Sequence, residues 1–192
     1  MNFEETKIQL ILNLVQAYHE ITGKMLKATY DELHEGELRV TIEEAKRNNV
    51  VNLTLTNTSL GFSKTFSDPW FELQNNSYKL LRDYLDKFEG EVDSQKVTIK
   101  LRINSLLYKA YVNDPDIVSE GDTLTAGIDI TNDVNLSFKF DENNRGIFTL
   151  TDVNNKLEVL NLTLPIQAIT PTNIINNIIP IINQSIEVYT QD

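Results

Sequence analysis

The sequence predicts a single α+β domain over residues 1–192, in which three helices pack with a mostly antiparallel sheet of about seven to nine strands. Two patterns support this class: apolar residues recur at helical spacing in three segments and alternate with polar residues in several others. The length of 192 residues suits one ordinary domain. No segment has the composition of a linker, and no fixed-period repeat is visible.

The first helix is expected from about Phe3 to Met25. Its apolar residues recur every three or four positions and are predicted to form one face: Ile8, Ile11, Leu12, Val15, Tyr18, Ile21 and Met25. Asn2 can cap this helix, and Glu4 and Glu5 suit the positive end of its dipole. An amphipathic N-terminal helix is therefore expected.

Two alternating runs follow, Glu37–Glu43 and Val51–Thr56, joined by the polar link Glu44–Asn49. They predict an antiparallel pair with one packed face and one solvated face. After the break at Asp68 and Pro69, the spacing of Leu81, Tyr84, Leu85 and Phe88 predicts a second amphipathic helix that ends at Gly90.

Beyond Gly90 the pattern changes to alternation, which predicts strands at Val97–Ile103, Leu124–Ile130 and Val134–Phe140. The turn Asp141–Gly146 leads to a return strand through Phe148 and Leu150. The last strand is expected at 157–164, where the apolar phase shifts after Val159 and so predicts a β-bulge.

The third helix is expected to start at Thr170, with Pro171 in its first turn, and to be rich in isoleucine. The segment 159–186 contains no Asp, Glu, Lys, Arg or His. Ile174, Ile178 and Ile182 are predicted to pack on the sheet. Ile175, Ile179 and Ile186 widen the apolar arc, which then needs a second apolar neighbour. Pro180 should kink the helix.

The predicted hydrophobic core combines residues from each of these elements. Its members are Ile11, Val15, Tyr18, Val40, Leu53, Leu81, Leu85, Ile99, Leu101, Leu136, Phe138, Ile178 and Ile182.

Composition and charge exclude several classes of function. The net charge of −11 argues against nucleic-acid binding, which needs clustered Lys and Arg, and disfavours an anionic membrane surface. Prolines and asparagines interrupt the isoleucine-rich segment, so no membrane span is expected. The absence of cysteine excludes disulfides and a thiolate nucleophile. Glu4 and Glu5 stand where an export signal would carry basic residues, so a cytoplasmic location is expected.

The sequence predicts no catalytic residue, no metal ligand and no cofactor. His19 and His34 are interpreted as surface residues, because no nucleophile motif accompanies them. The stretch from Asp141 to Asp152 resembles a calcium loop only superficially, since Arg145 places a cation where a ligand is needed. We interpret it as a hairpin turn. The carboxylate pairs are interpreted as solvated charges: Asp31/Glu32, Glu43/Glu44 and Asp114/Asp116.

A candidate interaction surface consists of an aromatic cluster together with the flanking isoleucines of the third helix. Its residues are Phe62, Phe66, Trp70, Phe71, Ile175, Ile179 and Ile186. Aromatic side chains exposed in a loop would be recognition anchors. The favoured interpretation is that the aromatic four close one end of the sheet beneath the second helix.

These observations favour a non-enzymatic acidic protein that engages another protein. The partner would carry a basic surface, as for an immunity protein, an inhibitor, or an antagonist from a phage or mobile element. A homo-oligomer stays open.

The alternative is a binder of an apolar or lipid-like ligand in a cavity between the curved sheet and the C-terminal helix. An early long helix, an antiparallel meander and the Leu/Ile/Asn/Pro-rich helix around Thr170–Ile186 resemble the element order of tubular lipid-binding domains. That resemblance implies an apolar ligand and designates no site residue.

Overall fold

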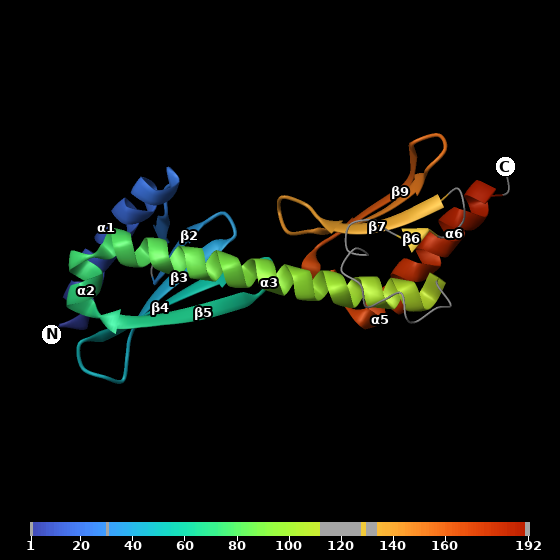
Figure 1. The fold of residues 1–192 in the computed structure, drawn as a ribbon. Helices are drawn as coiled ribbons and strands as arrows, with labels where there is room; N and C mark the ends of the chain where they lie inside the picture. Colours follow the sequence, from blue (N-terminus) through green and yellow to red (C-terminus); the bar gives the residue numbers. More distant parts are fainter. Residues whose placement is uncertain (1, 30, 112–127, 130–133, 191–192) are drawn as a thin grey trace. The chain divides into compact units, whose positions relative to one another are not determined.

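The computed structural model describes residues 2–29, 31–111, 128–129 and 134–190. The chain divides into two compact units, Met1–Asp93 (unit 1) and Ser94–Asp192 (unit 2), coloured blue to green and green to red in Figure 1. Each unit has its own antiparallel sheet and its own hydrophobic cluster among the described residues.

The α+β class and the antiparallel pairing are confirmed, and the number of strands lies within the predicted range. The expectation of a single sheet with a single core is wrong, because the strands form two sheets and the buried residues form two clusters. The short α2 helix brings the helix count above the predicted three. The boundary 1–192 as one cooperatively folding domain stays a prediction.

Unit 1 is a five-stranded antiparallel meander with helices on the apolar side of the sheet. The strands follow chain order across the sheet, β1-β2-β3-β4-β5. The elements are α1 (Phe3–Thr22), β1 (Lys27–Thr29), β2 (Glu32–Glu35), β3 (Leu38–Glu44), β4 (Val50–Asn57), β5 (Phe62–Pro69), α2 (Trp70–Asn75) and the first part of α3 (Ser77–Tyr111).

The predicted pair of strands is confirmed as β3 and β4, with Val40 opposite Leu55 and Ile42 opposite Leu53 on the buried face. The other face of β4 and β5 carries hydroxyl and amide side chains that bond across the strands. The Oγ1 atoms of Thr54 and Thr65 are hydrogen-bonded at 2.8 Å, and Thr56 Oγ1 and Ser63 Oγ are hydrogen-bonded at 2.7 Å. This alternation gives unit 1 one packed face and one polar face.

The first helix is confirmed, with Asn2 Oδ1 accepting a hydrogen bond from the Glu4 backbone N–H at 3.2 Å. Its buried face differs from the predicted stripe. The buried residues are Leu10, Leu14, Ala17 and Tyr18. Ile8, Leu12 and Met25 are exposed instead. Apolar residues cover more of this helix than one sheet face can bury, so spacing alone did not identify the side that packs.

The second predicted helix is longer than expected. Helix α3 continues through Gly90 to Tyr111, so the strand predicted at Val97–Ile103 is wrong. Ile103 and Leu107 are buried in unit 2, whereas Val97 and Leu101 are exposed. Leu101 is therefore not a core residue.

The other predicted core residues are buried or half-buried in one of the two clusters. Fully buried are Tyr18, Val40, Leu53, Leu81, Leu85, Leu136, Phe138, Ile178 and Ile182; Ile11, Val15 and Ile99 are half-buried.

Unit 2 is a second antiparallel meander, in the order β6-β7-β8-β9, packed with helices. Its elements after α3 are β6 (Ile128–Asp129), β7 (Val134–Phe140), β8 (Gly146–Asp152), β9 (Leu157–Leu164), the 3-10 turn η2 (Ile166–Ala168), α5 (Pro171–Asn173), the π-helical stretch η3 (Ile174–Ile178) and α6 (Ile179–Thr190). The strand predicted at Leu124–Ile130 lies outside the described residues except for β6.

The predicted bulge is confirmed in β9. Leu160 pairs with Leu150 and Glu158 pairs with Thr151, so Val159 between them has no partner in β8. The extra residue changes which face of the sheet the following side chains occupy.

The C-terminal helix begins as predicted, with Thr170 Oγ1 accepting a hydrogen bond from the Asn173 backbone N–H at 3.2 Å. Ile174, Ile178 and Ile182 are all buried in the core of unit 2. The π-helical stretch ends two residues before Pro180, whose ring would clash with a carbonyl of the preceding turn in a regular α-helix.

Candidate functional site: a groove between β9 and α6

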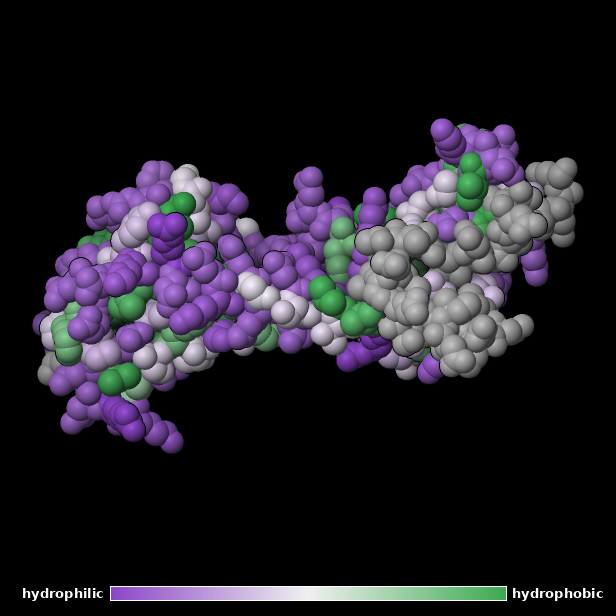
Figure 2. All heavy atoms as spheres, viewed as in Figure 1, coloured by the Kyte–Doolittle hydropathy of each residue, from purple (hydrophilic) through white to green (hydrophobic). Residues whose placement is uncertain are grey.

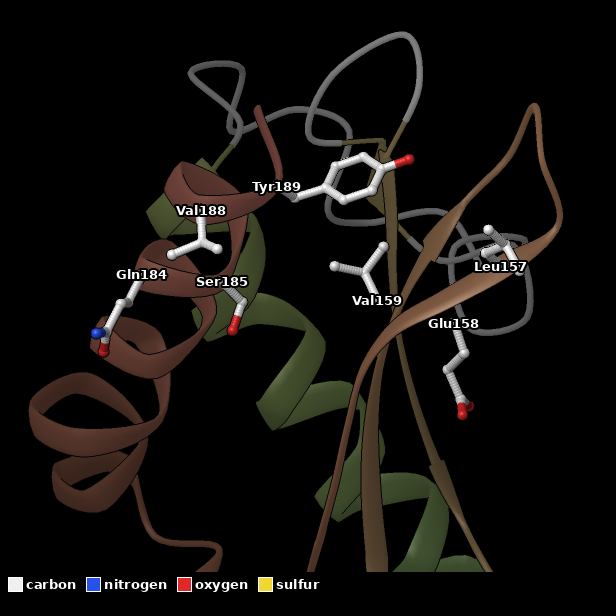
Figure 3. Close-up of a pocket in the computed structure, with 7 residues that line it drawn as sticks. All are labelled: Leu157, Glu158, Val159, Gln184, Ser185, Val188 and Tyr189. Carbon is white, nitrogen blue, oxygen red and sulfur yellow. The ribbon is translucent and has the colours of Figure 1, made fainter. Parts of the chain in front are cut away.

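The described surface of unit 2 contains a groove of about 550 Å³ between the start of β9 and the last turns of α6. Figure 3 shows Val159 projecting into the space between the two elements, with the Tyr189 ring at one end. The residues that line the groove are Leu157, Glu158, Val159, Gln184, Ser185, Val188 and Tyr189.

The groove is apolar at its walls and negatively charged at its rim. Leu157 and Val188 are 60% and 62% exposed and both line the same groove, so they form a small exposed apolar patch. The carboxylate of Glu158 is held at the strand by a hydrogen bond that its Oε1 accepts from Asn161 Nδ2 at 3.0 Å. The groove can therefore bind an apolar group on its walls while the Glu158 carboxylate pairs with a neighbouring hydrogen-bond donor or cation of the same ligand.

Tyr189 and Asp152 tie the end of α6 to the turn between β8 and β9. The Tyr189 hydroxyl donates to Asp152 Oδ2, and Asp152 is buried. Asp152 also accepts from the Asn154 N–H at 3.0 Å and from the side chain of Asn155 at 2.8 Å. The Asn155 side chain, together with backbone N–H groups of Asn155 and Asn154, holds the pKa of Asp152 below its ordinary value.

Because the pKa of Asp152 is lowered in the folded protein, the contribution of this carboxylate to stability depends on pH in a defined direction. Because the folded state favours the carboxylate, Asp152 contributes stability above its unfolded pKa of about 3.9, and that contribution is lost as the pH falls through the lower folded pKa. We expect Asp152→Asn to be less stable than the parent at pH 7, and its thermal midpoint to fall less between pH 5 and pH 2. Glu142→Gln, at an exposed residue of the preceding turn, is the control. An equal fall in the parent and Asp152→Asn would contradict this assignment.

The interpretation of Asp141–Gly146 as a hairpin turn is confirmed. Asp141 Oδ1 accepts from the backbone N–H groups of Asn143 at 2.9 Å and Arg145 at 2.8 Å, and Oδ2 accepts from Arg145 Nε at 2.8 Å. The backbone N–H of Arg145 is the main reason why the pKa of Asp141 is lowered. Over the ranges that the structure describes, no three His, Asp or Glu side chains are placed to hold a metal ion.

A second, smaller cleft lies in unit 1 and has a volume of about 380 Å³. It brings together two of the predicted carboxylate pairs, Asp31/Glu32 and Glu43/Glu44. Lys7 Nζ lies 3.0 Å from Asp31 Oδ1 in the same cleft. The remaining carboxylates give this part of unit 1 a negative surface. Figure 2 shows that hydrophilic residues cover most of the visible face of the unit, with apolar side chains only in small groups.

The predicted aromatic cluster is mostly packed into unit 1. Phe62 stacks on Phe88 with ring centroids 5.8 Å apart, and Phe66 stacks on Tyr84 at 4.4 Å. Both partners belong to the helix that follows, which is the arrangement that the favoured interpretation describes. Phe71 is exposed, and its ring is nearly perpendicular to that of Trp70, with ring centroids 6.4 Å apart.

The three isoleucines proposed for the interaction surface occupy different environments. Ile175 is exposed, while Ile179 and Ile186 are half-buried against the core of unit 2. None of them lines the groove. Sequence reasoning did not identify Leu157, Val159 or Val188 as site residues. The phase shift at Val159 was the one available signal, and it indicated a bulge without indicating what lies beside it.

Comparison of the chain with protein-family models, curated proteins and solved structures finds no match. In the described part of the chain, no helix is long and apolar enough to cross a membrane.

Proposed function

We propose that the protein is a non-enzymatic binding protein that engages another protein, and that the groove between β9 and α6 takes part in the contact. The observation that carries this proposal is the exposure of Leu157 and Val188 on either side of the groove. Exposed apolar side chains beside a concave surface are typical of binding sites. An immunity protein, an inhibitor, or an antagonist from a phage or mobile element would fit this description.

The net charge of −11 supports a partner with a basic surface. The acidic cleft of unit 1 and the carboxylate of Glu158 add to the negative field that such a partner would meet. Long-range attraction of this kind mainly accelerates association, and dissolved salt screens it within about 10 Å at 0.1 M.

The test is capture of a partner from the native host, followed by kinetics with the purified pair. We expect the association rate to fall by about tenfold or more between low salt and 0.5 M salt, while the dissociation rate changes little. A stopped-flow or surface-based measurement separates the two rates. An association rate that does not depend on salt would remove the electrostatic part of the proposal, and the absence of any protein partner would remove the whole.

The apolar walls and the volume of the groove support a second candidate, a small apolar or lipid-like ligand. A volume of about 550 Å³ falls within the range of ligand pockets. Because Glu158 is at the rim, a neutral or cationic amphiphile would suit the groove better than a fatty acid. Native mass spectrometry of the protein purified from its host separates the candidates, since only this one predicts a stoichiometric small molecule.

A further inference from the structure

Strand β9 lies at the edge of the sheet of unit 2, directly beside the groove. It pairs with β8 on one side, and no described strand pairs with its other side. Every second residue of an edge strand presents its backbone N–H and C=O outward, so such an edge can pair with another extended chain. Three consecutive residues of β9 line the groove, so the groove follows the bulged end of the strand along its backbone.

The edge strands of unit 1 carry features that discourage pairing. Strand β1 is only three residues long, and a very short edge strand is a poor template for an added strand. Strand β5 is eight residues long but contains Lys64, Asp68 and Pro69, and charged residues and proline both oppose the addition of a strand. Strand β9 is also eight residues long, and Glu158 is its one charged residue. The bulge at Val159 and the charge of Glu158 are its protective features, and both lie near the start of the strand, which leaves Leu160–Leu164 without such protection.

We propose that β9 accepts an extended segment of the partner protein as an added strand. The backbone of the segment bonds to the outer edge of β9, and alternate apolar side chains enter the groove between β9 and α6. A Lys or Arg of the segment pairs with Glu158. This inference rests on the proposed function and specifies how the partner docks.

Two features favour a peptide over a lipid-like molecule or a second copy of this chain. An added strand satisfies the row of backbone donors and acceptors at the edge, whereas an alkyl chain would cover them without bonding. A second copy would bring another net charge of −11 and another Glu158 to the same edge, which opposes self-pairing. A basic extended segment matches both the backbone edge and the charge.

The first arm of the test uses the intact protein and a phage-displayed library of random twelve-residue peptides. We expect enriched peptides that alternate apolar residues and contain Lys or Arg. Leu157→Lys and Val188→Lys should each weaken binding of the synthesised peptides by about tenfold or more, a change of about 1.4 kcal/mol for each factor of ten. Both residues are exposed, so neither substitution disturbs the core. Leu12→Lys, at a residue of unit 1 that is also 60% exposed, is the matched control and should leave binding unchanged.

The second arm measures amide hydrogen exchange with and without the selected peptide. Strand addition should slow exchange at alternate residues within β9, and methylation of alternate backbone nitrogens of the peptide should abolish binding. The inference is overturned if no peptide is enriched, if β9 gains no protection, or if Leu12→Lys weakens binding as much as the groove variants. The inference would also be overturned if dodecanol bound in the groove and prevented peptides from binding. Self-association of the protein through β9, measured by sedimentation, would overturn it as well.

Binding of the captured native partner to the groove variants tells whether strand addition or the proposed function itself is wrong. If a captured partner binds Leu157→Lys and Val188→Lys as tightly as the parent, the proposed function stands and strand addition is wrong. If no protein partner is captured, the proposed function itself fails.

Discussion

Removal of the chain after Ile169 is expected to unfold unit 2 and leave unit 1 folded. The deletion removes Ile174, Ile178 and Ile182, which are at most 2% exposed. Burial of each such side chain stabilises a fold by about 1.5–3 kcal/mol, and a whole domain is stable by only about 5–15 kcal/mol. The deletion also removes the hydrogen bond that the Tyr189 hydroxyl donates to Asp152 Oδ2.

Amide exchange resolved along the sequence measures this result, because it reports the two units separately. Among the described residues, the hydrophobic cluster of unit 1 contains none beyond Val92, so the protected amides of this unit should persist in the truncated protein. A chain that ends after Thr190 is the control and should resemble the parent. Loss of protection throughout the chain would instead support one cooperative domain over 1–192. A truncated unit 2 that keeps its protection would show that the C-terminal segment is an appendage.

The second large effect is expected for Gly146→Ala, at the first residue of β8. A methyl group at this position would overlap Cδ1 of Ile169 and come within 2.8 Å of the Phe138 ring. Phe138 is itself fixed against Phe148, with ring centroids 4.9 Å apart. Overpacking of this kind destabilises proteins by about 1–3 kcal/mol, so we expect a loss of that size in the free energy of unfolding measured in urea.

Two further variants test the cause of that loss. Ile169→Val removes the overlapping Cδ1 atom, so the double variant should recover part of the stability that Gly146→Ala loses. Gly90→Ala is the opposite control, since Gly90 lies inside α3 and a methyl group there meets nothing within 4 Å. It should stabilise the protein by about 0.5–1 kcal/mol. A neutral Gly146→Ala would show that Ile169 and the Phe138 ring relax without cost.

Local patterns were predictable from the sequence wherever one physical requirement dominated. Thr170 followed by Pro171 defines a helix start, and the phase shift after Val159 defines a bulge, because each has few structural alternatives. The segment Val97–Ile103 was ambiguous. Its residues alternate as in a strand, but Ile99, Ile103 and Leu107 also recur every four residues as in a helix. The structure resolves this ambiguity in favour of the helix, and the chain consequently forms two sheets.

The groove was not predictable, because the exposure of its walls depends on tertiary packing. Leu157 and Val188 are separated by 31 positions in the sequence, and each looks like an ordinary core residue of a strand or helix. Phe62 and Phe66 show the opposite ambiguity. Aromatic residues in a turn-prone stretch can serve recognition, but the rings of these two stack on α3, as the favoured interpretation expects. Residue type predicts burial or recognition only after the neighbouring elements are placed.

The π-helical stretch η3 affects the alignment of the isoleucines that pack on the sheet of unit 2. In a regular α-helix, residues four apart drift around the axis by about 40° at each step, so Ile174, Ile178 and Ile182 would spiral away from one line. The wider turn rotates less per residue, which offsets part of this drift and keeps the three side chains closer to a single row. Deletion of one residue within 175–177 would restore a regular turn but rotate Ile174 relative to Ile178, so the length of this stretch is constrained even where its exposed side chains are free to vary.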